Sequence, residues 1–223
     1  MIKFTVPQLH NMLKLQEALN RRIDPEWRSN EFPWHRAAWI EAAELMDHLG
    51  WKWWKKQEPD LVQAQIEIVD IWHFSLSYAL QSEGSNVEYV ADKIRDDIAL
   101  GSAPLANGWE LHMAGDDHHK ALLTTIEAFV TMCTGDGAVS PSVVLHIASK
   151  LELDAETMYR MYLAKNVLNI FRQDHGYKEG TYRKIWRGLE DNQVLAEWMK
   201  AEPTWGPDEL LAELGRSYGD LPA

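Results

Sequence analysis

Apolar residues recur at helical intervals along most of this chain, and no run of strict alternation flanked by hairpin turns stands out. This pattern predicts an all-α fold, a helical bundle whose members are separated by Gly, Pro and capping residues. The expected helices cover residues 6–20, 33–48, 61–82, 86–100, 118–132, 141–150 and 155–172. Residues 101–117 are expected to form the longest loop or an insertion, residues 175–192 a glycine-punctuated segment, and the end of the chain a helical tail.

The composition is that of an ordinary globular protein, with 46% hydrophobic and 25% charged residues in a chain of 223. No apolar run is long enough to cross a bilayer, the first residues lack the pattern of a signal peptide, and the single cysteine, Cys133, fits a reducing compartment. We therefore expect a soluble, cytoplasmic protein. A net charge of -12 argues against binding of polymeric nucleic acid, because such binding depends on Lys and Arg.

Two pairs of carboxylates, Glu41 with Glu44 and Glu67 with Asp70, are each spaced three residues apart, so the members of a pair share one helix face. Such pairs are common on solvated helix surfaces. The second pair, however, lies in a segment that is apolar nearly all round, which predicts a buried helix. Buried carboxylates must be protonated, paired or coordinated. Four carboxylates from two neighbouring helices would bind a hard divalent cation, Mg²⁺ or Mn²⁺, in preference to zinc.

His73 follows Asp70 by three residues, a spacing that resembles the acid-histidine pairs of carboxylate di-iron bundles. Those sites need two Glu-x-x-His pairs, and this chain offers only one such spacing near the other acids, so iron is the weaker alternative. A role for His73 in substrate binding and a role as a hydrogen-bonded core residue both stay open.

A basic segment stands apart from the acidic remainder of the chain, since residues 165–187 hold six basic and two acidic residues. Within it, Lys165, Asn169 and Arg172 share one face of a predicted helix. Lys and Arg are the side chains that bind phosphate, and the glycines that follow allow a ligand to approach the backbone closely. Taken alone, a basic glycine-containing loop is more often simply solvated. An acidic protein with one basic segment can nevertheless bind a small polyanion if a cation bridges the two.

Longer strings in the same regions are recognisable. The strings EAAEL, GWKWWK and EIVDIWHF resemble the two metal motifs, and the tryptophan-rich loop between them, of the dimeric dUTPase family, which belongs to the all-α NTP pyrophosphatase superfamily. The string KNVLNIFRQDHGYKEGTYRKIW, followed by GLEDN, resembles the family's C-terminal signature, and LQEALN resembles its nucleobase-contacting helix. Residues 82–150 match no motif and are interpreted as a variable inserted region of a single domain, 1–223, whose helical tail covers 193–223.

The resemblance implies an enzyme, a dUTP pyrophosphatase that hydrolyses dUTP, and also dUDP, to dUMP with water activated by Mg²⁺. It implies a homodimer, and it implies that Glu41, Glu44, Glu67 and Asp70 bind the metal, with Glu44 also bonded to the attacking water. The substrate site that it implies reads uracil with Gln16 and Asn20 and covers the base with one of Trp51, Trp53 and Trp54, of which Trp54 is favoured. The other implied substrate contacts are Lys165, Asn169, Arg172, Tyr177, Lys184 and Asn192, and His73 stays a candidate for substrate binding beside them.

Two alternatives to a dUTPase stay open from the sequence. Base choice depends on few residues, so a related pyrophosphatase that prefers dCTP, or accepts several nucleotides, would carry the same metal motifs. The alternative outside enzymes is a non-catalytic helical protein that binds a nucleotide or a partner.

Overall fold

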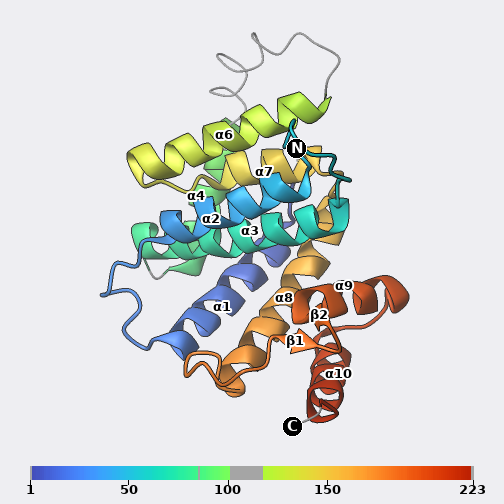
Figure 1. Ribbon diagram of the computed structural model, residues 1–223. Helices are drawn as coiled ribbons and strands as arrows, with labels where there is room; N and C mark the ends of the chain where they lie inside the picture. Colours follow the sequence, from blue (N-terminus) through green and yellow to red (C-terminus); the bar gives the residue numbers. More distant parts are fainter. Residues whose placement is uncertain (1, 85, 101–117, 222–223) are drawn as a thin grey trace.

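The computed structural model describes residues 2–84, 86–100 and 118–221, and within these ranges helices dominate, as predicted (Figure 1). The helices are α1 (Val6–Ile23), α2 (Trp34–His48), α3 (Leu61–Glu83), α4 (Val87–Leu100), α6 (His118–Asp136), α7 (Pro141–Lys150), α8 (Ala155–Asp174), α9 (Asp191–Ala201) and α10 (Pro207–Gly219). The prediction of an all-α fold is confirmed. The loop or insertion predicted for residues 101–117 lies outside the described residues.

The helix ends follow local capping chemistry. Thr5 forms a capping box with Gln8 at the start of α1, and Asp60 and Asp154 accept backbone N–H groups at the starts of α3 and α8. Several helices run further than predicted, and α1 continues one turn past Asn20 to Ile23. The tail is two helices, α9 and α10, with Pro207 in the first turn of the second.

One short antiparallel hairpin, which the sequence pattern did not predict, lies in the glycine-punctuated segment. Its strands are β1 (Ile185–Trp186) and β2 (Leu189–Glu190). Two-residue strands are too short to show a period of two in the sequence. Between them, Arg187 and Gly188 both have positive φ, as a two-residue type I′ turn requires.

The main core forms around α3, which runs beside α2 through the middle of the molecule, while α1 and α8 cross beneath them (Figure 1). Ile68, Ile71 and Trp72 of α3 are fully buried in this core. The region interpreted as an insertion contributes Ile126 and Phe129 to the same cluster of buried side chains. Its described helices therefore complete the core that holds α2 and α3 together.

A second apolar cluster fixes the C-terminal elements on α8. Leu168 and Phe171 of α8 pack with Trp186 of the hairpin, Leu195 of α9 and Leu214 of α10. Because α8 also contributes Met158 and Tyr162 to the main core, it joins the two clusters. This packing places α9 next to α3, and it brings Glu190 of the hairpin to the same pocket as Glu67 and Asp70.

Candidate active site

Three of the four predicted metal ligands converge between α2 and α3. One ligand oxygen each from Glu41, Glu67 and Asp70 lies within 4.8 Å of the others. Glu67 is buried because α3 is apolar on nearly every face, and Glu41 projects toward it from the neighbouring helix. The three carboxylates therefore come together only because α2 packs against α3.

The triad cannot carry its full negative charge unaided. Burial, and then the charges of Asp70 and Glu44, raise the pKa of Glu41 to about 7. Burial, and then the charges of Asp70 and Glu41, raise the pKa of Glu67 to about 8. Three carboxylates that share so little solvent need either protons or a cation, and an all-oxygen donor set of this kind fits a hard divalent metal ion.

Glu44, the fourth predicted ligand, is not part of the compact triad. It is exposed, and it lines the same polar pocket, of about 450 Å³, as the triad. His48, one turn further along α2, lines the pocket as well and brings Nε2 to 3.4 Å from Glu67 Oε1. Sequence reasoning missed His48, although its spacing of four residues from Glu44 placed it on the same helix face.

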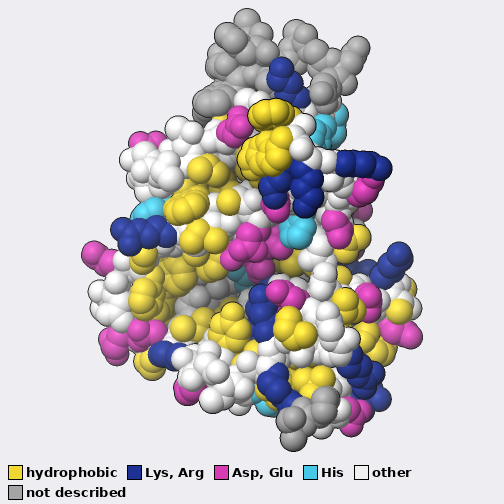
Figure 2. Space-filling model, viewed as in Figure 1, with side chains coloured by type: hydrophobic (Ala, Val, Ile, Leu, Met, Phe, Trp, Pro, Cys, Tyr) yellow, Lys and Arg dark blue, Asp and Glu magenta, His cyan; other side chains and the backbone are white. Residues whose placement is uncertain are grey.

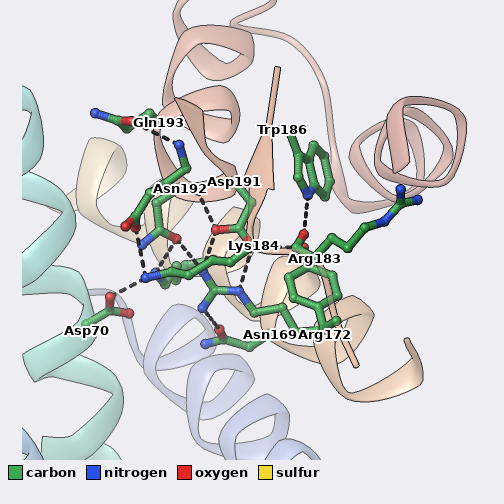
Figure 3. A network of polar contacts seen from close by, with 12 residues as sticks. Asp70, Asn169, Arg172, Arg183, Lys184, Trp186, Asp191, Asn192 and Gln193 are labelled. Carbon is green, nitrogen blue, oxygen red and sulfur yellow. Dashed lines mark hydrogen bonds and ion pairs between the residues drawn. The ribbon is translucent and has the colours of Figure 1, made fainter. Parts of the chain in front are cut away.

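The basic residues predicted on α8 line the opposite side of the pocket. Lys165 Nζ is 2.8 Å from Asp70 Oδ2 and 2.6 Å from Asn192 Oδ1, while its side chain is only 5% exposed. Arg172 forms a bidentate ion pair with Asp191, with bonds of 2.8 Å from Nε and 2.7 Å from Nη2 (Figure 3). A continuous chain of polar contacts therefore joins the carboxylate triad to the first turn of α9.

Arg172 has little hydrogen-bonding capacity left for a ligand. Besides the two bonds to Asp191, it donates from Nη2 to Asn192 Oδ1 at 3.0 Å and from Nη1 to Asn169 Oδ1 at 3.2 Å. A guanidinium has five N–H groups, so one is left for the pocket. In this arrangement Arg172 offers a fixed positive charge and a single donor, rather than the two-pronged grip for which arginine is known.

Tyr177 and Lys184 reach the pocket from the segment after α8. The guanidinium of Arg172 lies 5.5 Å from the centre of the Tyr177 ring. Lys184 pairs with Glu190 at 2.8 Å, and both side chains are more than 40% exposed, so this pair can open more easily than the buried ones. The structure thus brings Lys165, Arg172, Tyr177, Lys184 and Asn192 together around one pocket, with Asn169 behind Arg172.

A second, buried polar network contains the residues predicted to read the base. Gln16 Nε2 donates to Asn20 Oδ1 at 3.0 Å and to Ser77 Oγ at 2.9 Å. Gln16 Oε1 lies 2.7 Å from His73 Nδ1 and accepts from the Tyr162 hydroxyl at 3.1 Å. The amide of Gln16 is thus fully bonded inside the protein. Ser77 and Tyr162 are members of this network that the sequence did not reveal.

His73 is neutral at physiological pH because complete burial lowers its pKa to about 3. Its ring stacks on that of Tyr162 at a centroid distance of 4.2 Å. Nδ1 faces Gln16, whereas Nε2 has no hydrogen-bond partner among the described residues. Such an unpaired buried nitrogen is unusual in a structural histidine.

An apolar hollow of about 340 Å³ opens beside this network. Asn20 lines it together with aromatic and aliphatic side chains of α1, α2, α3 and the segment between α1 and α2, including Trp27, Phe32, Trp34, Ala37 and Phe74. Ala37 precedes Glu41 by four residues, and Phe74 follows Asp70 by four, so on both helices the hollow lies one turn, about 5.4 Å, from the triad. Figure 2 shows acidic side chains gathered next to a hollowed area of hydrophobic ones.

Trp54 lines neither this hollow nor the polar pocket. It packs edge to face against Trp51 and Trp53 on the segment between α2 and α3, and 56% of it is exposed. A role for Trp54 over the base therefore requires this segment to move toward the hollow.

A helical bundle that sets a buried carboxylate triad against a pocket of lysine and arginine defines a class, the helical pyrophosphatases that hydrolyse nucleoside triphosphates. Within that class, the dUTPase family matches residues 8–177, about three quarters of the chain, and the protein belongs to this family of all-α, dimeric-type dUTPases. It is a dUTP pyrophosphatase. Enzymes of this family use a divalent metal ion, and the triad supplies a fitting donor set.

Comparison with curated proteins gives no match. None of the described helices is long and apolar enough to span a membrane.

The match ends at Tyr177, so the hairpin and α9 lie outside it. Asp191, the buried partner of Arg172, belongs to this part of the chain. Sequence reasoning singled out its neighbour Asn192 and passed over Asp191, because a lone aspartate after a glutamate gives no signal of burial. Only the packing of α9 against α8 reveals it.

Proposed function

We propose that this dUTPase uses Mg²⁺, with Mn²⁺ as a possible substitute, held by Glu41, Glu67 and Asp70 and by Glu44 at the edge of the triad. The observation that carries this proposal is the triad itself, whose buried oxygens need a countercharge and whose donors suit hard cations. Bound Mg²⁺ would neutralise phosphate oxygens and lower the pKa of a coordinated water. Lys165, whose Nζ is 2.8 Å from Asp70 Oδ2, would then turn from Asp70 to a phosphate oxygen, because the metal ion would balance the charge of Asp70 in its place.

The nucleoside would occupy the apolar hollow beside the triad. The hollow is one helical turn from the metal ligands, which is the order of separation between a sugar and its α-phosphate. Phe74 and Trp34 would pack against the sugar and the base, and stacking on aromatic rings is favourable for any base. Movement of Trp54 would close the hollow from outside.

Uracil would be recognised by the buried network at the hollow. Asn20 lines the hollow directly. His73, whose Nε2 has no hydrogen-bond partner among the described residues, precedes Phe74 of the hollow and bonds to the same Gln16 as Asn20. Gln16, fully bonded behind them, would hold both side chains in place. Cytosine exchanges a donor and an acceptor on this edge, so it would leave buried groups unpaired and be rejected.

The triphosphate would extend from the hollow across the metal ligands toward the cations of α8. Lys165 and Arg172 each supply fixed charge, and Tyr177 and Lys184 close the far rim. The oxygen of Asn192 faces two cations, which can only donate, so its NH₂ group points away from them and is available to a phosphate oxygen.

Glu44 would accept a hydrogen bond from the attacking water. It lines the pocket without belonging to the compact triad, so it can contact solvent and the metal shell at the same time. Attack in line on the triphosphate would give dUMP and pyrophosphate. The same contacts would accept dUDP, which lacks only the terminal phosphate.

We further propose that the protein works as a cytoplasmic homodimer. Support comes from the family and from exposed apolar side chains at the ends of α2 and α3, such as Trp53, Leu61 and Val62. Light scattering of the purified protein would give the subunit count, and a monomer at micromolar concentration would contradict the dimer.

A panel of deoxynucleotides tests the substrate assignment. We expect Mg²⁺-dependent release of pyrophosphate from dUTP, turnover of dUDP, and kcat/KM for dCTP lower by about a hundredfold or more, because a mismatched base edge leaves buried groups unpaired. Equal turnover of dCTP and dUTP would contradict the proposed recognition of uracil. Loss of activity in EDTA tests the need for a metal ion, and titration of the EDTA-treated protein with Mg²⁺ and with Mn²⁺ shows which of the two restores activity.

A further inference from the structure

Asp191 is fully buried, and every lone-pair position of its carboxylate is used. Its oxygens accept from Arg172 Nε and Nη2, from the Tyr182 hydroxyl at 2.8 Å, and from the backbone N–H of Asn192 at 2.9 Å. Figure 3 shows Asp191 and Asn192 of α9 facing Arg172 of α8. With no exposed surface, Asp191 cannot itself touch a substrate.

Asp191 fixes the orientation of two residues of the pocket, Arg172 and Asn192. Its bidentate pair fixes the plane of the Arg172 guanidinium, because rotation would break two short bonds at once. That plane directs Nη2 to Asn192 Oδ1 and leaves one N–H of Nη1 for the pocket. The backbone bond from Asn192 to the same carboxylate fixes the first turn of α9, so both pocket residues are set by one buried anion.

We propose that Asp191 is the positioning residue of the phosphate-binding side of the site, and that it acts through Arg172. This inference rests on the proposed function, in which Arg172 and Asn192 face the phosphates. A purely structural ion pair would not need its arginine in the pocket, yet Arg172 lines it. The ligand that Arg172 would contact in this orientation is a pyrophosphate group, whichever base the nucleotide carries.

The test measures binding of magnesium pyrophosphate to the full-length protein by titration calorimetry, with thermal melting of every variant. Asp191→Asn keeps the shape but puts an NH₂ group against donors, so we expect the Kd for pyrophosphate to rise by about tenfold or more. Arg172→Gln should raise it similarly. If Asp191 acts through Arg172, the double variant should bind no more weakly than Arg172→Gln alone.

A matched control changes the same chemical group elsewhere. Asp97 accepts bonds from Ser140 and from the backbone of Ser142 at the start of α7, away from the pocket. Asp97→Asn should lower the melting temperature without changing the Kd for pyrophosphate. Should Asp191→Asn fail to fold, Tyr182→Phe removes just one of the four bonds to Asp191, and we expect a smaller rise in Kd of about twofold.

Three results would overturn the inference. One is an unchanged Kd in Asp191→Asn, or in Tyr182→Phe if that is the variant that folds, with only a lower melting temperature. Another is an equal loss of affinity from Asp191→Asn on the wild-type and Arg172→Gln backgrounds. The last is absence of pyrophosphate binding by the wild-type protein, which would also contradict the proposed function and is thereby distinguished from the first two.

Discussion

In the metal-free protein, the contribution of the carboxylate triad to stability should fall as the pH rises. The pKa of Glu41 stands at about 7 and that of Glu67 at about 8, against 4.5 for an ordinary glutamate. At a pH between 4.5 and these raised pKa values, the folded protein keeps a proton that the unfolded chain has lost. Because the folded state then binds more protons, the contribution of the triad to stability is greatest below pH 4.5 and declines through the window up to about pH 8.

The size of the effect can be worked from one proton shared between Glu41 and Glu67. A rise of its pKa from 4.5 to 7 corresponds to about 3 kcal/mol of stability, since one pKa unit is worth roughly 1.4 kcal/mol. In a domain of this size that is roughly 6 to 12 °C in melting temperature. Mg²⁺ replaces the proton, so its stabilising effect should be larger at pH 8 than at pH 6.

The assay is thermal melting in EDTA and in Mg²⁺ from pH 5 to pH 8, for the wild type and for Glu67→Gln. The variant keeps the size of the side chain and removes one buried charge, so it should melt higher than the wild type in EDTA at pH 8 and gain little from Mg²⁺. Subtracting the two curves removes the contribution of other titrating groups. A wild-type curve that runs parallel to that of Glu67→Gln would refute the reasoning.

Three further predictions concern single side chains. Glu44→Gln should lower kcat for dUTP by about a hundredfold or more, and unchanged pyrophosphate release would show that Glu44 does not assist the attacking water. Trp54→Ala should raise KM for dUTP by about tenfold if the ring stacks on the base, whereas steady-state kinetics with an unaltered KM would point to Trp51 or Trp53. Phe129→Ala should lower the free energy of unfolding in urea by about 3 to 5 kcal/mol, and a loss below about 1 kcal/mol would mean that α6 contributes little to the core.

Much of the fold could be predicted because helices are local. Periodicity, capping residues and glycines gave the helices within about a turn, and the apolar character of α3 on nearly every face predicted its burial. The same local geometry placed Glu41 beside Glu44, Glu67 beside Asp70, and Lys165 on the face of Arg172. The hairpin was not predicted, because strands of two residues are too short to show an alternation of apolar and polar residues.

The arrangement of the site was decided by packing between segments distant in the sequence. Glu41 joins the triad and Glu44 does not, although the two share a helix face, because α2 packs on α3 with Glu41 against Glu67 and leaves Glu44 exposed. Gln16 meets His73 and Tyr162 across 57 and 146 positions, and Arg172 meets Asp191 on another helix. The sequence by itself therefore determined which chemistry the protein carries and on which helices. Only the tertiary structure decided which charges are paired, which are buried and which face the pocket, because those depend on how helices pack and not on the spacing within them.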